Sequence, residues 1–82
     1  MRELSQKKEI LEKAKYRYNF SRDIYYNRGA KKVFSLEAIE DHDSQWLSEK
    51  INAATVGDQW QFFFNTDPSE KVKGEILREL GA

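Results

Sequence analysis

Residues 59–65, Gln-Trp-Gln-Phe-Phe-Phe-Asn, decide the fold class that the sequence predicts. The stretch is rich in aromatic residues, carries no charge and follows the turn-forming pair Gly57-Asp58, which is typical of a β-strand. Its run of three phenylalanines is typical of a strand that is covered on both faces. Because the backbone N–H and C=O groups of a strand need partners, a second strand must lie elsewhere in the chain.

Residues 31–39 are the best candidate for that partner. Phe34, Leu36 and Ala38 alternate there with polar residues, and a period of two favours a half-buried strand. Residues 36–40 are also good helix formers behind a cap at Ser35, so a strand and a helix both remain open for this run.

Two further helices are predicted around the second strand. Residues 43–54 place apolar side chains on one face behind a cap at Asp43 or Ser44. Residues 67–70, Asp-Pro-Ser-Glu, predict the start of a last helix that ends near Gly81. A helical connection between the two strands allows them to pair in parallel.

The first part of the chain has a helical pattern. Residues 4–26 contain no Pro or Gly, and apolar or small residues recur at spacings of seven, three and four: Leu4, Leu11, Ala14, Tyr18, Ser21 and Tyr25. We expect one long helix that ends at the turn signal of residues 27–29, Asn-Arg-Gly.

The expected architecture is therefore a single small domain over residues 1–82, of α+β or small α/β class, in the order helix, strand, helix, strand, helix. A long basic helix (about 4–26) precedes an acidic β-α-β-α part (about 31–80). Because two strands make a thin sheet, a homodimer that pairs along the free edge of residues 59–65 is one way to extend it.

Composition excludes several classes of protein. The 82 residues are 39% hydrophobic and 34% charged and include no cysteine, which excludes disulfide scaffolds, thiolate zinc sites and thiol catalysis. No leader or membrane-spanning segment is expected, so we expect a cytoplasmic location.

The two parts of the chain carry opposite charge. Residues 1–33 contain ten Lys or Arg and four Asp or Glu, whereas residues 34–82 contain four and ten. Such asymmetry indicates either contact of the basic part with an anionic partner or attraction between the two parts, within one molecule or between copies.

Tyr16 and Phe20 are the candidate binding residues. They lie four residues apart and, on a helix, would face away from the stripe that includes Tyr18. We expect this second face to bind a protein partner, with the aromatic rings as anchors and Lys13 and Asp23 orienting the contact.

A nucleic acid is the alternative partner. The residues that would carry that contact are Lys15, Arg17, Arg22, Tyr26, Arg28, Lys31 and Lys32. Three acidic residues, Glu9, Glu12 and Asp23, lie near the Tyr16 and Phe20 side of the predicted helix and would repel phosphate. A protein partner is therefore preferred.

A metal site is the second alternative. Asp41, Asp43 and Asp67 follow the two predicted strands and are oxygen ligands of the kind that Mg²⁺ or Ca²⁺ binds, with His42 as a general base. The simpler interpretation makes Asp43 and Asp67 helix caps and the others solvated turn residues.

The sequence thus predicts a small interaction module that acts as an adaptor, regulator or inhibitor rather than an enzyme. One lone histidine and no phosphate-binding loop argue against catalysis, and no cofactor is expected. A less favoured form of the same idea has Glu40, Asp41 and Asp43 mimic phosphate charge and bind a basic site on a partner.

Overall fold

The computed structural model describes residues 2–55 and 57–81 and has four helices with a four-stranded sheet, an α+β fold. The elements are α1 (Arg2–Lys13), β1 (Arg17–Asn19), β2 (Ile24–Asn27), β3 (Lys32–Ser35), α2 (Leu36–Asp41), α3 (Ser44–Asn52), β4 (Gln61–Phe63) and α4 (Glu70–Glu79). The predicted two-stranded sheet is wrong, because β1 and β2 add two strands to it.

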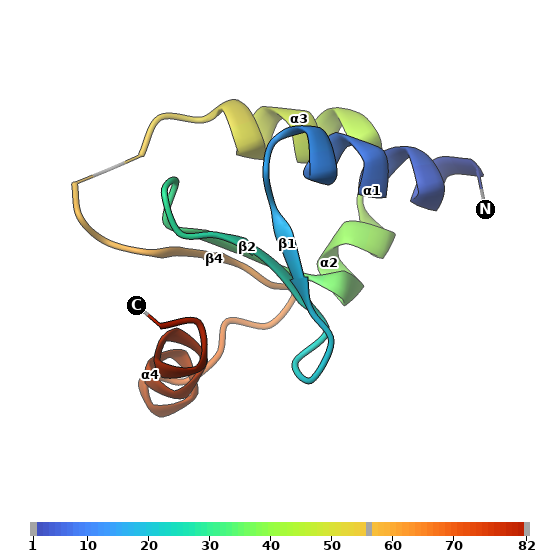
Figure 1. Cartoon of the computed structure of the whole chain (residues 1–82). Coiled ribbons are helices and arrows are strands. Elements are labelled where there is room, and N and C mark those ends of the chain that lie inside the picture. Colours follow the sequence, from blue (N-terminus) through green and yellow to red (C-terminus); the bar gives the residue numbers. More distant parts are fainter. Residues whose placement is uncertain (1, 56, 82) are drawn as a thin grey trace.

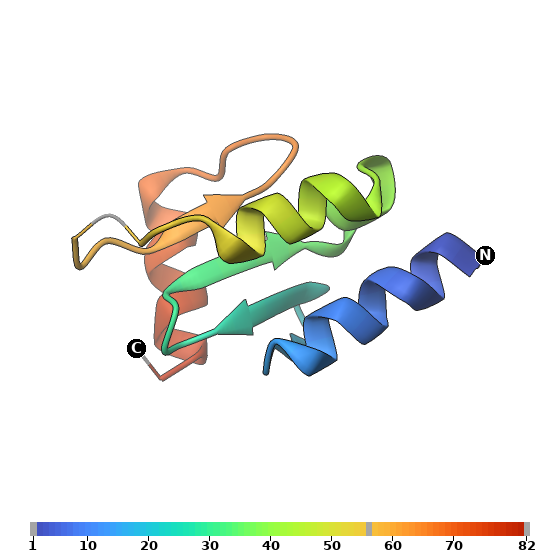
Figure 2. The same cartoon turned by 90° about the horizontal axis from the view of Figure 1, so that it is seen from above.

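The sheet lies between two layers of helices. Figure 1 shows α1, α2 and α3 on one face and α4 on the other, and Figure 2 shows the same arrangement from above. The strand order is β1-β2-β3-β4, with the first three strands antiparallel and β3 and β4 parallel as predicted.

Each face of the sheet has its own hydrophobic cluster. The cluster under α1–α3 is built around Leu11, Phe34 and Leu47, and the one over α4 around Val33 and Ile76, all of them buried. Successive residues of β3 therefore point to opposite clusters, and this strand is covered on both faces. The half-buried strand predicted from the alternation of Phe34, Leu36 and Ala38 is wrong in this respect, because Leu36 and Ala38 lie in α2.

The predicted helix of residues 4–26 is correct only up to Lys13, where α1 ends, and its second part is wrong because β1 and the start of β2 lie there. The Lys15 N–H donates to the carbonyl of Glu12 and the Tyr16 N–H to that of Leu11, at 3.0 and 2.9 Å, which is the Schellman pattern of a helix end. Lys15 adopts the left-handed conformation that this pattern requires, with φ of 69°. Because this position holds a lysine and not the usual glycine, the helix end at Lys13 could not be recognised from a glycine in the sequence.

The segment 31–39 contains both of the structures left open for it. β3 runs from Lys32 to Ser35, and α2 starts at once because the Ser35 hydroxyl accepts from the Ala38 N–H at 3.1 Å. Asp43 caps α3 as predicted. The cap of α4 is Ser69 and not Asp67, so this last helix starts later than the sequence suggested.

Two buried lysines belong to the fold rather than to a surface. Lys32, on β3, is 1% exposed, and its ammonium donates to the carbonyls of Lys50, Ile51 and Ala53 at 2.7–2.9 Å. Lys7, on α1, donates to the Ile39 carbonyl at 2.7 Å. Both ammonium groups thus lie where the ends of α3 and α2 carry partial negative charge.

Candidate functional site: the β1–β2 turn and the adjoining cavity

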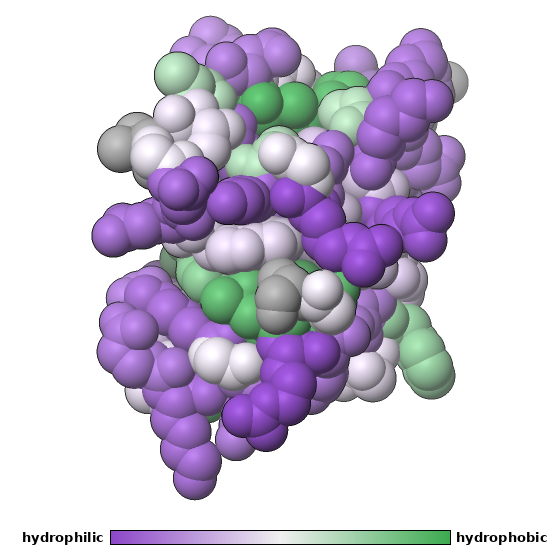
Figure 3. Space-filling model, turned by 60° about the vertical axis from the view of Figure 1, so that its left-hand side comes forward, coloured by the Kyte–Doolittle hydropathy of each residue, from purple (hydrophilic) through white to green (hydrophobic). Residues whose placement is uncertain are grey.

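The turn between β1 and β2 presents one apolar ring to solvent. Phe20, an aromatic residue of a type usually found in the core, is 81% exposed. The turn extends from the sheet toward the level of α4 (Figure 1). On the face drawn in Figure 3 the surface is mostly hydrophilic, and hydrophobic residues appear there in small areas between hydrophilic side chains.

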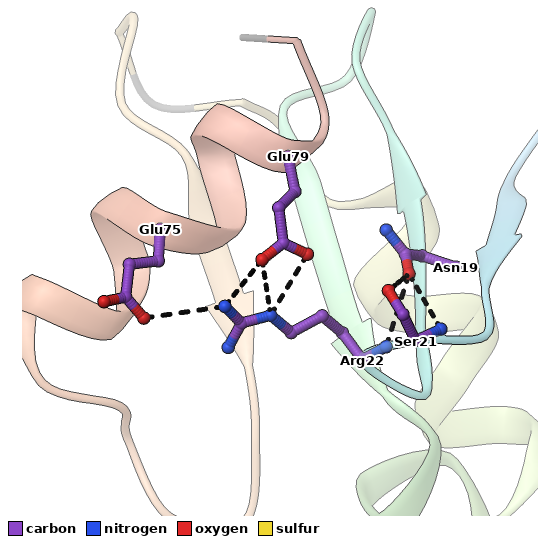
Figure 4. Close-up of polar contacts among 5 residues, drawn as sticks. All are labelled: Asn19, Ser21, Arg22, Glu75 and Glu79. Atoms are coloured by element: carbon purple, nitrogen blue, oxygen red, sulfur yellow. Dashed lines mark hydrogen bonds and ion pairs between the residues drawn. The ribbon is translucent and has the colours of Figure 1, made fainter.

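Hydrogen bonds from Asn19 fix the shape of this turn. Its Oδ1 atom accepts from the N–H and hydroxyl of Ser21 at 3.1 and 2.8 Å and from the Arg22 N–H at 3.3 Å (Figure 4). Asp23 then takes a left-handed conformation with φ of 52°, and its carbonyl accepts from the Leu36 N–H at 2.8 Å. The exposed ring of Phe20 is therefore carried by an ordered backbone.

Arg22 ties the turn to α4. Its Nη2 and Nε atoms lie 2.6 and 3.0 Å from Glu79 Oε2, and Nη2 lies 3.5 Å from a carboxylate oxygen of Glu75 (Figure 4). The hydrogen bond from Arg22 lowers the pKa of Glu79, and the bond to Glu79 raises the pKa of Arg22. The charge of Arg22 is thus used within the molecule.

Tyr18 adds a second aromatic surface beside the turn. It is 45% exposed, its ring centroid lies 5.0 Å from that of Tyr25, and its hydroxyl donates to Asp23 Oδ1 at 2.7 Å. That hydrogen bond raises the pKa of Tyr18. The prediction that Tyr18 belongs to the apolar stripe of a helix is wrong, because residues 17–19 form β1.

A cavity of about 510 Å³ opens next to the turn. Its lining consists of Arg22, Asp23, Ser35, Leu36, Glu37, Glu40, Phe64, Asn65 and Thr66. These residues come from the β1–β2 turn, from the start of α2 and from the segment after β4, so the cavity lies at the carboxyl ends of the parallel strands β3 and β4. Ligand sites of open parallel sheets gather at this end.

The predicted protein-binding residues do not form one surface. Tyr16 is 5% exposed and packs in the cluster under α1–α3, with its ring 5.7 Å from that of Phe34. Burial raises its pKa to about 12. Lys13 lies at the end of α1 and pairs with Glu9 at 3.1 Å. Of the four predicted residues, Phe20 and Asp23 are thus the two that lie in the β1–β2 turn.

The alternative set of basic residues is largely used inside the molecule. Arg22 binds α4, Arg28 donates to the Leu80 carbonyl at 3.2 Å, Lys31 lies 3.6 Å from an Asp58 carboxylate oxygen and Lys32 is buried. Of the other residues predicted for nucleic-acid binding, Tyr26 is partly buried against the cluster beside α4, and Lys15 and Arg17 are exposed. Attraction between the basic and acidic parts is therefore found within one molecule.

The weak metal candidates have separate roles. Asp41 accepts from the Asn65 amide at 2.6 Å, Asp43 accepts from the Trp46 N–H at 2.8 Å, and Asp67 binds the Lys73 ammonium at 3.2 Å. Among residues 2–55 and 57–81 no three acidic or histidine side chains are placed to hold a metal ion. A metal site is therefore not proposed.

The single histidine has a structural environment as well. His42 Nδ1 lies 2.9 Å from the Ala38 carbonyl oxygen, and because a carbonyl only accepts, Nδ1 carries the proton. The imidazole stacks on Trp46 with ring centroids 3.9 Å apart. With Nδ1 as the donor, Nε2 keeps its lone pair, and the role of His42 as a general base stays a prediction.

β4 forms one edge of the sheet, as the dimer prediction requires. The Gln61 N–H donates to the Lys31 carbonyl at 2.9 Å, so alternation directs the N–H and C=O groups of Phe62 toward the free side. A groove of about 390 Å³ runs between this strand and α4, with the Lys73 ammonium 5.5 Å from the centre of the Phe62 ring. Pairing of this edge with a second copy stays a prediction.

Comparisons with known proteins add no assignment: no family model, curated protein or solved structure matches the chain. Within residues 2–55 and 57–81, no helix has both the length and the apolar character needed to cross a bilayer. The β1–β2 turn and the cavity are therefore the features that indicate a function.

Proposed function

We propose that this chain is a small interaction module that docks on a protein partner through the β1–β2 turn, with Phe20 as the anchoring side chain. The observation that carries the proposal is the 81% exposure of that ring on a turn fixed by side-chain hydrogen bonds. An exposed phenylalanine gains by burial in a partner, and an ordered turn loses little entropy when it binds.

The surroundings of Phe20 support a protein partner. Tyr18 offers a half-exposed ring, and the exposed Asp23 supplies a charged group at the side of the turn. Aromatic residues with nearby polar groups are the usual composition of the energetic centre of a protein interface. The role of adaptor, regulator or inhibitor follows from this mode of action, in which the module acts by occupying a surface.

A nucleic acid is the less favoured partner class. Four of the seven residues predicted for that contact are bound internally or buried, and the cavity beside Phe20 is lined by three carboxylates. Titration with single-stranded and duplex oligonucleotides at two salt concentrations separates the two classes. Binding that weakens steeply with salt and is lost on substitution of Lys15 or Arg17 would replace the present proposal.

The test uses a photoreactive phenylalanine analogue at position 20 and, as a control, at position 49, which is exposed on α3. In extracts of the native cell, we look for a protein that is crosslinked from position 20 and not from position 49. That protein is then purified, and its affinity for the unmodified chain and for Phe20→Ser is measured by calorimetry. We expect Phe20→Ser to weaken binding at least about tenfold, equivalent to about 1.4 kcal/mol.

Two controls make the outcome interpretable. Lys8→Ser changes an exposed residue of α1 and should bind like the parent chain. The thermal midpoint of Phe20→Ser should equal that of the parent chain, because the ring makes few internal contacts at 81% exposure. Equal affinity of Phe20→Ser and the parent chain would refute the proposal.

A further inference from the structure

The cavity beside the β1–β2 turn has an excess of negative charge. Asp23, Glu37 and Glu40 line it, and Arg22 is the one basic lining residue. Since Arg22 is already paired with Glu79 and Glu75, its charge offsets little of this excess.

Two carboxylates of α2, those of Glu37 and Glu40, lack a cationic partner among the side chains that the structure describes. Among the described side chains no basic nitrogen lies within 4.0 Å of the carboxylate of Glu37 or Glu40. Lys7 approaches from the α1 side, but its ammonium contacts the backbone carbonyl of Glu40, at 3.4 Å. Asp41, hydrogen-bonded to the lining residue Asn65, places another carboxylate next to the cavity.

The remaining walls suit a long cationic side chain. Leu36 and Phe64 supply apolar surface between the carboxylates and the segment after β4, and the volume of about 510 Å³ lies in the range of ligand pockets. An aliphatic stem can pack on such surface while its charged end meets the acids. A cation above an aromatic face gains further attraction.

We infer that this cavity receives an arginine side chain of the protein on which the turn docks, an inference that rests on the proposed function. The occupant is an arginine because its planar guanidinium binds carboxylates in bidentate fashion, while its aliphatic stem can pack on the apolar lining residues Leu36 and Phe64. Phe20 then supplies apolar contact and the cavity supplies charge recognition, both from the same end of the sheet.

The probe is N-acetyl-argininamide, titrated into the isotopically labelled chain and followed by amide NMR shifts. The matched control ligand is N-acetyl-citrullinamide, which has nearly the same shape and no charge. We expect the arginine derivative to shift the amides of residues 35–40 and 64–66, and the citrulline derivative to bind at least threefold more weakly.

Substitutions of the acidic residues and a change of salt concentration test the same inference independently. The double variant Glu37→Gln/Glu40→Gln should weaken binding of the arginine derivative at least threefold, and Glu12→Gln/Glu49→Gln, which changes exposed acids of α1 and α3, should not. Raising NaCl from about 20 mM to about 300 mM, which shortens the Debye length from about 20 Å to about 6 Å, should weaken binding in the parent chain. This salt arm needs no substitution.

The outcomes separate this inference from the proposed function. No shifts in residues 35–40 and 64–66, or equal binding of both derivatives, would overturn the arginine site even where Phe20 crosslinks a partner. Arginine binding in the cavity together with unchanged partner affinity of Phe20→Ser would instead overturn the docking role of the turn.

Discussion

The buried ammonium of Lys32 offers the sharpest test of how this fold uses its basic residues. The three carbonyls that it binds belong to the last turn of α3 and the residue after it, whose C=O groups have no partner within the helix. Lys32→Met keeps most of the apolar stem and removes the charge and all three hydrogen bonds.

The expected loss follows from opposing contributions. Each hydrogen bond to a charged group contributes about 1.5 kcal/mol or more, and methionine relieves part of this loss because burial of an ammonium costs several kcal/mol. Desolvation of that ammonium also lowers the pKa of Lys32. We expect a net decrease of about 3 kcal/mol in the free energy of unfolding, which is below the total of about 4–12 kcal/mol expected for a chain of this size.

Urea denaturation followed by tryptophan fluorescence measures this decrease. With a denaturant slope of about 1 kcal/mol per molar, the midpoint should fall by about 3 M. The control is Lys8→Met, a change of an exposed lysine of α1 that should cost less than about 0.5 kcal/mol. Equal midpoints for the two variants would refute the assignment of Lys32 to the end of α3.

Three further predictions concern single side chains. Tyr16→Phe should keep or raise the free energy of unfolding, because the buried hydroxyl finds no hydrogen-bond partner among residues 2–55 and 57–81. In alkaline denaturation the same variant should remove a loss of stability between pH about 10 and about 12, since the folded-state pKa of Tyr16 is raised to about 12 and the unfolded chain ionises first. Lys15→Gly should raise the thermal midpoint by relieving about 1 kcal/mol of left-handed strain. In Arg22→Gln the pKa of Glu79, measured by carboxyl NMR, should rise toward its ordinary value, and acid unfolding should begin at higher pH because the ion pair is lost.

The second half of the chain could be predicted because its signals are local. The strand Gln61–Phe63 within the aromatic run and the cap at Asp43 follow from patterns of a few residues. The parallel pairing of β3 with β4 was expected from the helical connection between the two strands. Ser35 indicated a helix start and Phe34 a strand, and both indications were correct for adjacent parts of one segment.

The first half could not be predicted from its helical spacing. Residues 16–26 are rich in Tyr, Phe and Ile, which favour strands, and the turn formers Asn19, Ser21 and Asp23 interrupt them. Those two signals were available but were outweighed by the absence of Gly and Pro. Pairing of β1 and β2 with β3 is a tertiary interaction that local spacing does not report.

The candidate site was accordingly predicted in part. Phe20 and Asp23 were singled out, while the cavity joins residues distant in sequence, such as Glu37 and Phe64, that only the folded sheet brings together. The opposite charges of the two parts of the chain predicted an attraction within one molecule as one alternative, and the contact of Arg22 with Glu79 is of that kind.

Hydrogen–deuterium exchange of the chain, free and bound to the protein captured through position 20, tests most directly where docking takes place. Slower exchange on binding is predicted for the amides of residues 18–23, 35–40 and 64–66, with α3 and α4 unchanged. Slower exchange confined to α1, α3 or the free edge of β4 would contradict the assignment of the β1–β2 turn as the docking surface.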